Sequence, residues 1–239
     1  STSDPVAKLV YEESDEHVNA GSQYYRQYMI IARSGRIWSW GNGSTYSGGT
    51  NFISDPAGVV ETWVPKLDSR IDNVVDAYVG AGWYHQAMVL KADGTVWAIG
   101  NDQDGLFTPN AHGYVWVPVY ADYLTNVVKL YPGGGRHGKS CGFLTADGKW
   151  YMSGMNNHGQ SGNGGTATGW TAPALGHARL PAPITKVTYI GSTNDGANYQ
   201  TIYALCGDGN LYSWGYNASS QLGWDDDQEY SCVPSPVLF

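Results

Sequence analysis

The fold of this chain is decided by one phrase that occurs four times: RSGRIWSWGN at 33–42, KADGTVWAIGN at 91–101, TADGKWYMSGMN at 145–156 and CGDGNLYSWGYN at 206–217. Each version carries a turn glycine and, six residues later, a second glycine. The turn glycines are Gly35, Gly94, Gly148 and Gly209, and the second glycines are Gly41, Gly100, Gly154 and Gly215. Both sets advance by 59, 54 and 61 residues, which indicates a repeated structural unit.

The residue pattern of the repeated phrase predicts a β-hairpin. Asp-Gly or Ser-Gly between apolar runs is typical of a tight hairpin turn, because glycine accepts the positive φ that such a turn needs. A run of β-forming residues precedes each turn, at 28–31, 87–90, 141–144 and 202–205. After the turn, apolar residues occupy adjacent positions, such as Val96 and Trp97. Adjacent strand residues face opposite sides, so the pattern predicts strands covered on both faces, as in stacked sheets.

Two further β runs flank each hairpin. The upstream runs lie at 7–11, 73–78, 126–131 and 186–190, and the downstream runs contain Val64-Pro65, Val117-Pro118, Leu180-Pro181 and Val233-Pro234. Proline belongs on sheet edges, so each downstream run is the expected outer strand. The sequence therefore predicts an all-β, β-propeller-like fold of about four four-stranded blades. Its units would be approximately 1–65, 66–118, 119–181 and 182–239 of a single repeat domain, 1–239.

Residues of several units carry a family resemblance. In the second unit, GAGWYH at 80–85 precedes a strand and its Asp-Gly turn; in the fourth, WGYN at 214–217 precedes QLG at 221–223, and HGQSG at 158–162 echoes that pattern. These residues resemble the repeats of the regulator of chromosome condensation family, and we expect a phage or bacterial relative. The resemblance implies a β-propeller. Because this propeller hosts nucleotide exchange, chromatin docking, scaffolding and inhibition, it does not fix the function.

The ends of the chain suggest how the blades would be joined. Family propellers have more and shorter blades than the four units visible here. The last segment follows Val233-Pro234 and would complete the blade that the first β run opens. We therefore expect a closed four-blade ring in which the N- and C-terminal strands pair. An open arc completed by another subunit is the alternative.

Composition and charge narrow the function classes. The 13 Lys+Arg against 21 Asp+Glu give a formal net charge of −8, which argues against a broad phosphate-binding surface and so against nucleic acid. No apolar run reaches the length of a membrane span, and the start, STSDPVAKLV, lacks the features of a signal peptide. Aromatic residues make up 13% of the chain, too many to stay solvated in a disordered protein.

No motif predicts catalysis, a cofactor or a metal. GGGRHGKS at 133–140 fits the phosphate-loop pattern, but a phosphate loop opens a helix, and the residues that follow here indicate a strand and a hairpin. The six histidines lack ligand spacing, and the acidic runs at 101–105 and 225–229 complete no EF-hand. Cys141, Cys206 and Cys232 are too few for a disulfide framework. We expect no catalytic residue, no cofactor and no metal ion.

Aromatic residues in the variable inserts are the predicted binding residues. One tryptophan falls in the insert of each unit, with tyrosines nearby. The set is Trp63, Trp116, Trp170, Trp224, Tyr46, Tyr114 and Tyr230. Rigid aromatic side chains on polar loops give a large contact area at small entropic cost, so the pattern indicates a binding surface. The alternative is that each tryptophan fills a gap between neighbouring blades.

These observations favour a non-catalytic recognition or structural module. Scarce lysine and abundant glycine, tyrosine and small polar residues are typical of a bacteriophage virion protein, such as a tail fibre, tail tip or receptor-binding protein. Its expected partners are other virion proteins or a glycan or protein of the host surface, with no nucleic acid and no membrane insertion, and we expect a homo-oligomer. The expected location is the virion, with an extracellular or cytoplasmic location as the alternative. A carbohydrate-binding lectin and a guanine-nucleotide exchange factor-like propeller are the alternative functions.

Overall fold

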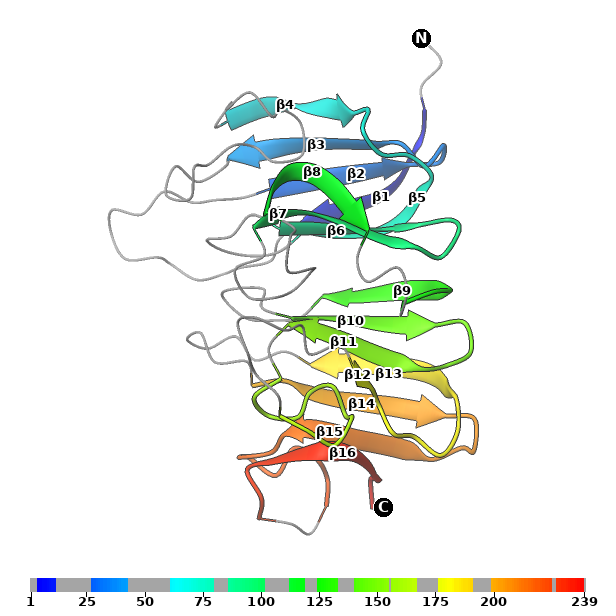
Figure 1. The fold of residues 1–239 in the computed structure, drawn as a ribbon, viewed down its shortest axis with the longest axis vertical. Coiled ribbons are helices and arrows are strands. Elements are labelled where there is room, and N and C mark those ends of the chain that lie inside the picture. The colour runs from blue at the N-terminus through cyan, green and yellow to red at the C-terminus, as the bar shows by residue number, and fades with distance from the viewer. Residues whose placement is uncertain are drawn as a thin grey trace, which may run out of the picture. The chain divides into compact units, whose positions relative to one another are not determined.

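Sixteen strands make up the regular structure of the described residues, and they form four antiparallel four-stranded sheets (Figure 1). The computed structural model describes residues 4–11, 27–42, 61–79, 86–101, 112–118, 124–132, 140–154, 156–166, 176–190, 199–224 and 227–238. Over these ranges the chain contains no α-helix, and so none with the length and hydropathy of a membrane span. The predicted all-β fold class is confirmed.

Each sheet takes its four strands consecutively from the chain, and we number the sheets as blades 1 to 4. Blade 1 contains β1 (Val6–Tyr11), β2 (Gln27–Ala32), β3 (Ile37–Asn42) and β4 (Glu61–Asp68). Blade 2 contains β5 (Val74–Val79), β6 (Gln86–Lys91), β7 (Val96–Asn101) and β8 (His112–Pro118). Blade 3 contains β9 (Val127–Pro132), β10 (Ser140–Thr145), β11 (Trp150–Gly154) and β12 (Gly176–His177). Blade 4 contains β13 (Ile184–Ile190), β14 (Thr201–Cys206), β15 (Leu211–Tyr216) and β16 (Tyr230–Pro236).

The repeated phrase forms the hairpin at the centre of every blade, as predicted. Its turn glycines, Gly35, Gly94, Gly148 and Gly209, have φ values of 81°, 81°, 76° and 83°. Such values lie in the left-handed region that side chains disfavour. In blade 1, for example, the Gly35 N–H donates to the Ala32 carbonyl at 2.9 Å and closes the turn.

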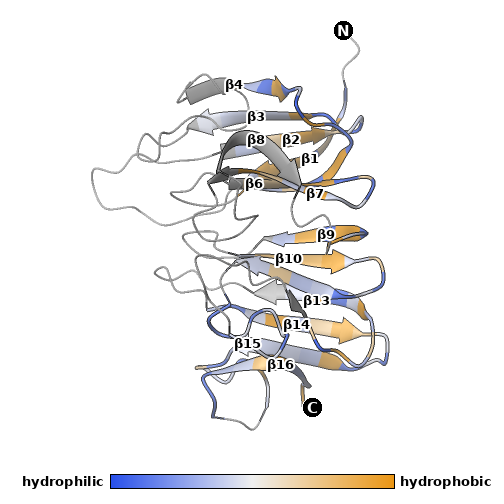
Figure 2. Ribbon diagram, in the orientation of Figure 1, coloured by the Kyte–Doolittle hydropathy of each residue, from blue (hydrophilic) through white to orange (hydrophobic). Residues whose placement is uncertain are grey.

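The chain divides into two compact units. The first comprises Ser1–Asp102 and Asn110–Asn126 and holds the strands of blades 1 and 2, and the second comprises Gln103–Pro109 and Val127–Phe239 and holds the strands of blades 3 and 4. Figure 2 shows why strands of each unit can stack, since apolar residues are concentrated along strands such as β10 and β14 while polar residues occupy the hairpin turns.

In the first unit, blades 1 and 2 pack face to face through one apolar core. Its buried members are Met29, Ile31, Ile37, Ile71, Val74, Ala77, Val79, Ala87, Val89 and Ile99. The hairpin turn of blade 1 also contacts the start of blade 2, because the Val74 N–H donates to the Gly35 carbonyl at 2.9 Å. Blade stacking is therefore supported by side-chain burial and by backbone hydrogen bonds together.

In the second unit, blades 3 and 4 pack through a core that contains two indoles. Trp150 and Trp214 are fully buried and meet edge to face, with ring centroids 6.5 Å apart. The other buried members are Ala178, Ile184, Val187, Ile202, Ala204, Cys206 and Tyr212. Ile184 N–H donates to the Gly148 carbonyl at 2.8 Å, which repeats the turn-to-blade contact of the first unit.

Two expectations about strands are corrected by the structure. The last segment completes its own blade rather than the blade that β1 opens, because β16 pairs with β15 and β1 pairs with β2. In blade 3 the outer strand is the two-residue β12, and Leu180-Pro181 follows it rather than lying within it. There, the N–H of Arg179 donates to the Gly162 carbonyl at 3.1 Å, so the chain after β12 is hydrogen-bonded to the loop between β11 and β12.

Candidate functional site

Four of the seven predicted binding residues lie in outer strands rather than in loops. Trp63 belongs to β4, Tyr114 and Trp116 belong to β8, and Tyr230 is the first residue of β16. The expected loop position was wrong for these four, because the aromatic and β-branched residues before each Val-Pro extend the outer strand. Tyr46 and Trp170 lie outside the described residues.

Trp224 is a loop residue, as expected, but its indole is tied to its own blade. The Nε1–H donates to the hydroxyl of Ser213 on β15 at 2.7 Å, and the side chain is half-buried. This contact lies within one blade, so it does not test the alternative interpretation, in which each tryptophan fills a gap between neighbouring blades.

Tyr230 is brought into an aromatic cluster whose other members the sequence did not single out as binding residues. The cluster consists of His158, Tyr199, Tyr216 and Tyr230, and we call it the tyrosine–histidine cluster. The imidazole of His158 lies 5.2 Å from the Tyr199 ring, 5.1 Å from the Tyr216 ring and 5.9 Å from the Tyr230 ring, between centroids. Tyr199 and Tyr216 are 4.4 Å apart. Such tilted and edge-on contacts suit aromatic rings.

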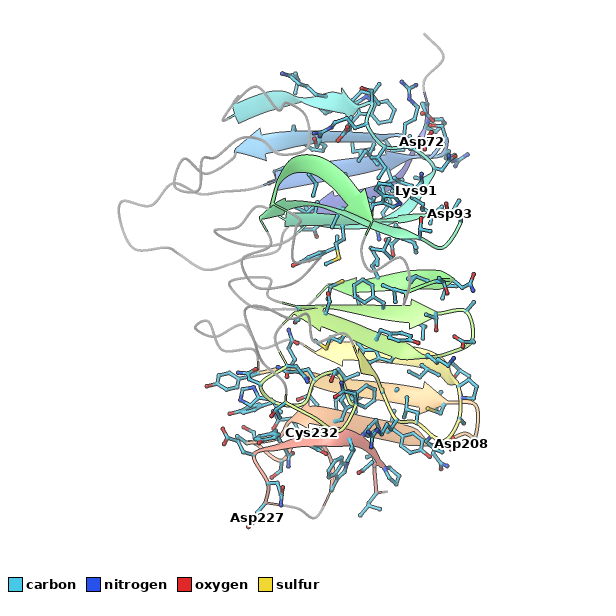
Figure 3. All side chains as sticks on the ribbon, viewed as in Figure 1. Asp72, Lys91, Asp93, Asp208, Asp227 and Cys232 are labelled. Carbon is cyan, nitrogen blue, oxygen red and sulfur yellow. The ribbon has the colours of Figure 1, made fainter. Side chains whose placement is uncertain are left out.

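Four separate segments of the second unit supply these rings. His158 lies in the loop after β11, Tyr199 precedes β14, Tyr216 ends β15 and Tyr230 begins β16. Tyr216 and Tyr230 are register partners, so their strands fix them side by side. The cluster therefore lies at the end of blade 4 opposite its hairpin turn, which Asp208 marks in Figure 3. Sequence periodicity gave no signal for it, because the four positions are not equally spaced.

Hydrogen bonds hold the loop that carries His158 in one conformation. The side chain of Asn156 accepts from the Ser161 N–H at 2.8 Å and donates to the Gly165 carbonyl at 2.8 Å. The His158 N–H donates to Oε1 of Gln160 at 2.9 Å. Polar side chains that satisfy a loop backbone in this way fix its path. The imidazole is thus presented by a rigid loop.

The surroundings of Tyr216 favour the neutral form of its phenol. Burial, followed by the nearby Tyr199 and the Glu229 carboxylate, raises the pKa of Tyr216. Glu229 and Asp227 are exposed in the segment that leads to β16, and Figure 3 labels Asp227 there. The cluster combines partly exposed aromatic faces, phenol donors and carboxylate acceptors. This combination suits contact with a polar surface rather than a chemical step.

The remaining candidates for chemistry are the thiols and the 133–140 motif. Burial, and to a lesser extent Asp208, raises the pKa of Cys206 to about 11, and burial raises the pKa of Cys232. Thiols with raised pKa values are poor nucleophiles at neutral pH. Of the 133–140 motif, Ser140 is described, and it begins β10 where a phosphate loop would need a helix. Among the described residues, no group of three His, Cys, Asp or Glu side chains is placed to hold a metal.

Comparisons with known proteins agree with the repeat pattern. A family model described as the regulator of chromosome condensation (RCC1) repeat matches residues 208–239, which run from the last hairpin turn through the last outer strand. The match covers one repeat, in blade 4. The mouse protein "Regulator of chromosome condensation" is 27% identical over 157 residues, which are 64% of this chain and 34% of the mouse protein. Its human counterpart is 29% identical over the same shares.

Solved structures support the RCC1-type blade architecture across the chain. Human WBSCR16 superposes with a TM-score of 0.63 at 16% identity, over 100% of this chain and 55% of that protein. Prp20p from Saccharomyces cerevisiae superposes with a TM-score of 0.59 at 20% identity, over 88% of this chain and 49% of Prp20p. This chain therefore spans about a third of its curated relatives and about half of these structures, as part of a propeller. These mammalian and yeast proteins give no support to the expected phage or bacterial origin.

Proposed function

We propose that this chain is a non-catalytic recognition module that binds the surface of a partner through the tyrosine–histidine cluster. The observation that supports this proposal is that four partly exposed rings, from four segments of the chain, lie together at one end of blade 4. Tyr230 is 38% exposed and lies at the open side of the cluster. Rings already held in place lose little entropy when a partner packs on them.

The partner we propose is a protein or glycan surface. A carbohydrate ring can stack on a tyrosine face while its hydroxyls donate to carboxylates, and Glu229 lies close enough to influence the pKa of Tyr216. This proximity favours a lectin as the specific form of the proposal. The binding expected of one such site is weak, so several copies on one particle would bind far more strongly than one.

A glycan array tests the lectin form of the proposal. We expect the full chain to bind a subset of glycans, and Tyr199→Ala and Tyr230→Ala to lose at least about tenfold of that binding, equivalent to about 1.4 kcal/mol. Tyr151→Ala is the control, because Tyr151 is a half-buried tyrosine on β11 outside the cluster. Equal binding by all three variants and the unchanged chain would contradict the role of the cluster.

A bacteriophage virion is the setting we propose for the module, as a tail fibre, tail tip or receptor-binding protein. The proposal rests on composition, namely 32 glycines and 18 tyrosines with a net charge of −8. Mass spectrometry of purified particles from the source of this chain is the direct test. Absence of the chain from those particles would reject this setting without touching the recognition role.

Exchange-factor activity is the second candidate, because the structure of Prp20p was described together with its binding properties to Gsp1p and histones. A nucleotide-release assay with a small guanine-nucleotide-binding protein tests it. Acceleration by the full chain would support this function over the first, whereas an unchanged release rate would reject it.

A further inference from the structure

We propose that blade 1 of this chain docks head to tail on the loop 217–223 of blade 4 in a second copy, with Trp40 seated against that loop. The proposal is independent of the tyrosine–histidine cluster. It rests on a docking contact that the second unit already contains, between blades 3 and 4. The two halves of the same contact are also present separately, the loop on blade 4 and the apolar face on blade 1.

The loop 156–162 and the loop 217–223 have the same internal hydrogen bonds, 61 residues apart. An asparagine side chain accepts from the N–H five residues later, a glutamine side chain accepts from the N–H two residues earlier, and two backbone turns follow each other. The bonds are Ser161 N to Asn156 Oδ1 at 2.8 Å, His158 N to Gln160 Oε1 at 2.9 Å, Gly159 N to Asn156 O at 3.0 Å and Gly162 N to Gly159 O at 2.9 Å in the first loop. Their counterparts are Leu222 N to Asn217 Oδ1 at 2.9 Å, Ser219 N to Gln221 Oε1 at 2.8 Å, Ser220 N to Asn217 O at 2.8 Å and Gly223 N to Ser220 O at 3.3 Å. The chain thus builds the same loop twice.

The first of these loops is a docking element for the next blade. The Gln160 carbonyl accepts from Nε1–H of Trp214 at 2.8 Å in the buried core, and a Cβ added at Gly162 would lie 2.9 Å from the same nitrogen. The Gly164 N–H donates to the Cys232 carbonyl on β16 at 2.8 Å. Trp214 is 0% exposed as a result.

The second loop has the same shape but faces solvent. Residues 218–220 and Gly223 are exposed. Among the described residues, the nearest atom to a Cβ added at Gly223 is Val237 Cγ1, at 3.0 Å, and it belongs to the same blade. The Gln221 carbonyl accepts from the Tyr203 hydroxyl, also of blade 4. A carbonyl oxygen has two lone pairs, so Gln221 can still accept from an incoming indole.

Blade 1 offers the indole that this loop would receive. Trp40 and Trp214 each precede the second glycine of the phrase, Gly41 or Gly215, and both glycines have positive φ, 127° and 95°. Trp40 pairs with Tyr28 of β2, as Trp214 pairs with Ile202 of β14. Yet Trp40 is half-buried, stacked on Tyr28 with centroids 5.2 Å apart.

The face around Trp40 is apolar and partly exposed. One register row on this face runs across all four strands as Leu9, Ile30, Trp38 and Leu67. Leu9 is 50% and Leu67 is 37% exposed. In blade 4 the row positions Ala204 and Tyr212 are buried against blade 3. The same face is thus core in one blade and surface in the other.

A second copy of the chain is the occupant that this pair of surfaces fits. Both halves of the contact are present in one chain, on different blades, so copies can join head to tail.

One difference between the two loops changes how closely blade 1 of a second copy is expected to pack against the loop 217–223. Ser220 occupies the position of Gly159, where an added Cβ would collide with Cys232 of the following outer strand. The outer strand of a docked blade 1 therefore has to lie farther from the loop than β16 does. Ser220→Gly should remove this obstacle and tighten association.

Sedimentation velocity of the full chain over a range of concentrations tests the proposal. We expect a dimer or longer assembly that dissociates on dilution. Leu9→Glu places a charge in the apolar face, and Gly223→Asn places a side chain where the docked indole would lie; each should weaken association at least about tenfold. Val75→Glu is the matched control, because Val75 is 53% exposed on the first strand of blade 2, and this variant should associate normally. Melting curves of each variant check that it has folded.

Mixing the two weakened variants distinguishes head-to-tail docking from other contacts. Leu9→Glu keeps an intact loop, and Gly223→Asn keeps an intact blade 1 face, so the mixture should form a heterodimer through one unaltered contact. Recovery of association in the mixture supports the proposal. A wild-type chain that stays monomeric at every concentration, or a mixture that does not recover, overturns it.

Discussion

Blades 1 and 4 carry a tryptophan at the same position of the repeated strand, but the two side chains differ in burial and in their contacts. In blade 4, Trp214 is buried by blade 3 and its indole donates to the Gln160 carbonyl. In blade 1, Trp40 is half-buried against a tyrosine of its own sheet. The two blades share the residue type, whereas its energetic role is set by what packs against it.

The largest expected effect is on the free energy of unfolding when each of the two tryptophans is replaced by alanine. Trp214→Ala should lower the free energy of unfolding by about 3–5 kcal/mol, because it leaves a cavity and removes the hydrogen bond to the Gln160 carbonyl in the core. Trp40→Ala should cost less than half as much, since its indole already contacts solvent. Urea unfolding of the two variants measures the difference. Equal losses would show that blade 1 is covered as fully as blade 4.

The next effect concerns the matched loop positions Gly159 and Ser220. Gly159→Ala should destabilise the chain by about 2 kcal/mol or more, because its Cβ collides with β16 and its φ is +70°. Ser220→Ala should change stability by less than about 0.5 kcal/mol, since the position already carries a Cβ at φ 57° on the surface. Thermal melting of both variants gives the comparison. A large loss at Ser220 would mean that this loop is docked in the isolated chain.

A smaller difference is expected between the hairpin turns of the two blades. Gly35 and Gly209 have nearly the same φ, but a Cβ at Gly35 would lie 2.8 Å from Asn73 Cα, whereas a Cβ at Gly209 meets nothing within 4 Å. Gly209→Ala should therefore cost about 1 kcal/mol for the φ alone. Gly35→Ala should cost more, because it also disturbs the contact with blade 2. Chemical denaturation resolves the two, and equal costs would argue against the close approach.

The smallest expected effect is on the rate at which a thiol reagent labels Cys232, which reports on the packing of the loop 156–162. Cys232 lies on β16 where the loop 156–162 packs, and burial raises its pKa from an ordinary value of 9.0. Its thiolate should form less readily than that of a free thiol at pH 8, so a thiol reagent should label it slowly. Labelling should accelerate as the pH rises through that raised pKa. At constant pH, labelling should also be faster in the Gly159→Ala variant, because this substitution disturbs the packing of the loop on β16. Rapid labelling of the unchanged chain would contradict a closed contact between blades 3 and 4.

The sequence predicted the blades well because their signals are local. A glycine in each turn, alternating apolar runs and a proline in the outer strand act over a few residues, and the observed β3, β7, β11 and β15 follow them. The outer strand of blade 3 was the exception, because the chain after β12 is hydrogen-bonded to the loop that precedes this strand instead of extending it through Leu180-Pro181. The candidate site was predicted poorly for a related reason. His158, Tyr199, Tyr216 and Tyr230 meet through strand pairing and loop packing, and their spacing in the sequence carries no sign of that.

By itself, the sequence determined that this chain forms four hairpin-centred sheets, since turn geometry and side-chain alternation are properties of neighbouring residues. Only the tertiary structure decided which sheet faces are buried, which strands complete each blade and which rings lie together. Those outcomes depend on what packs against each surface. A repeated segment that gives blades 1 and 4 the same tryptophan cannot specify that difference.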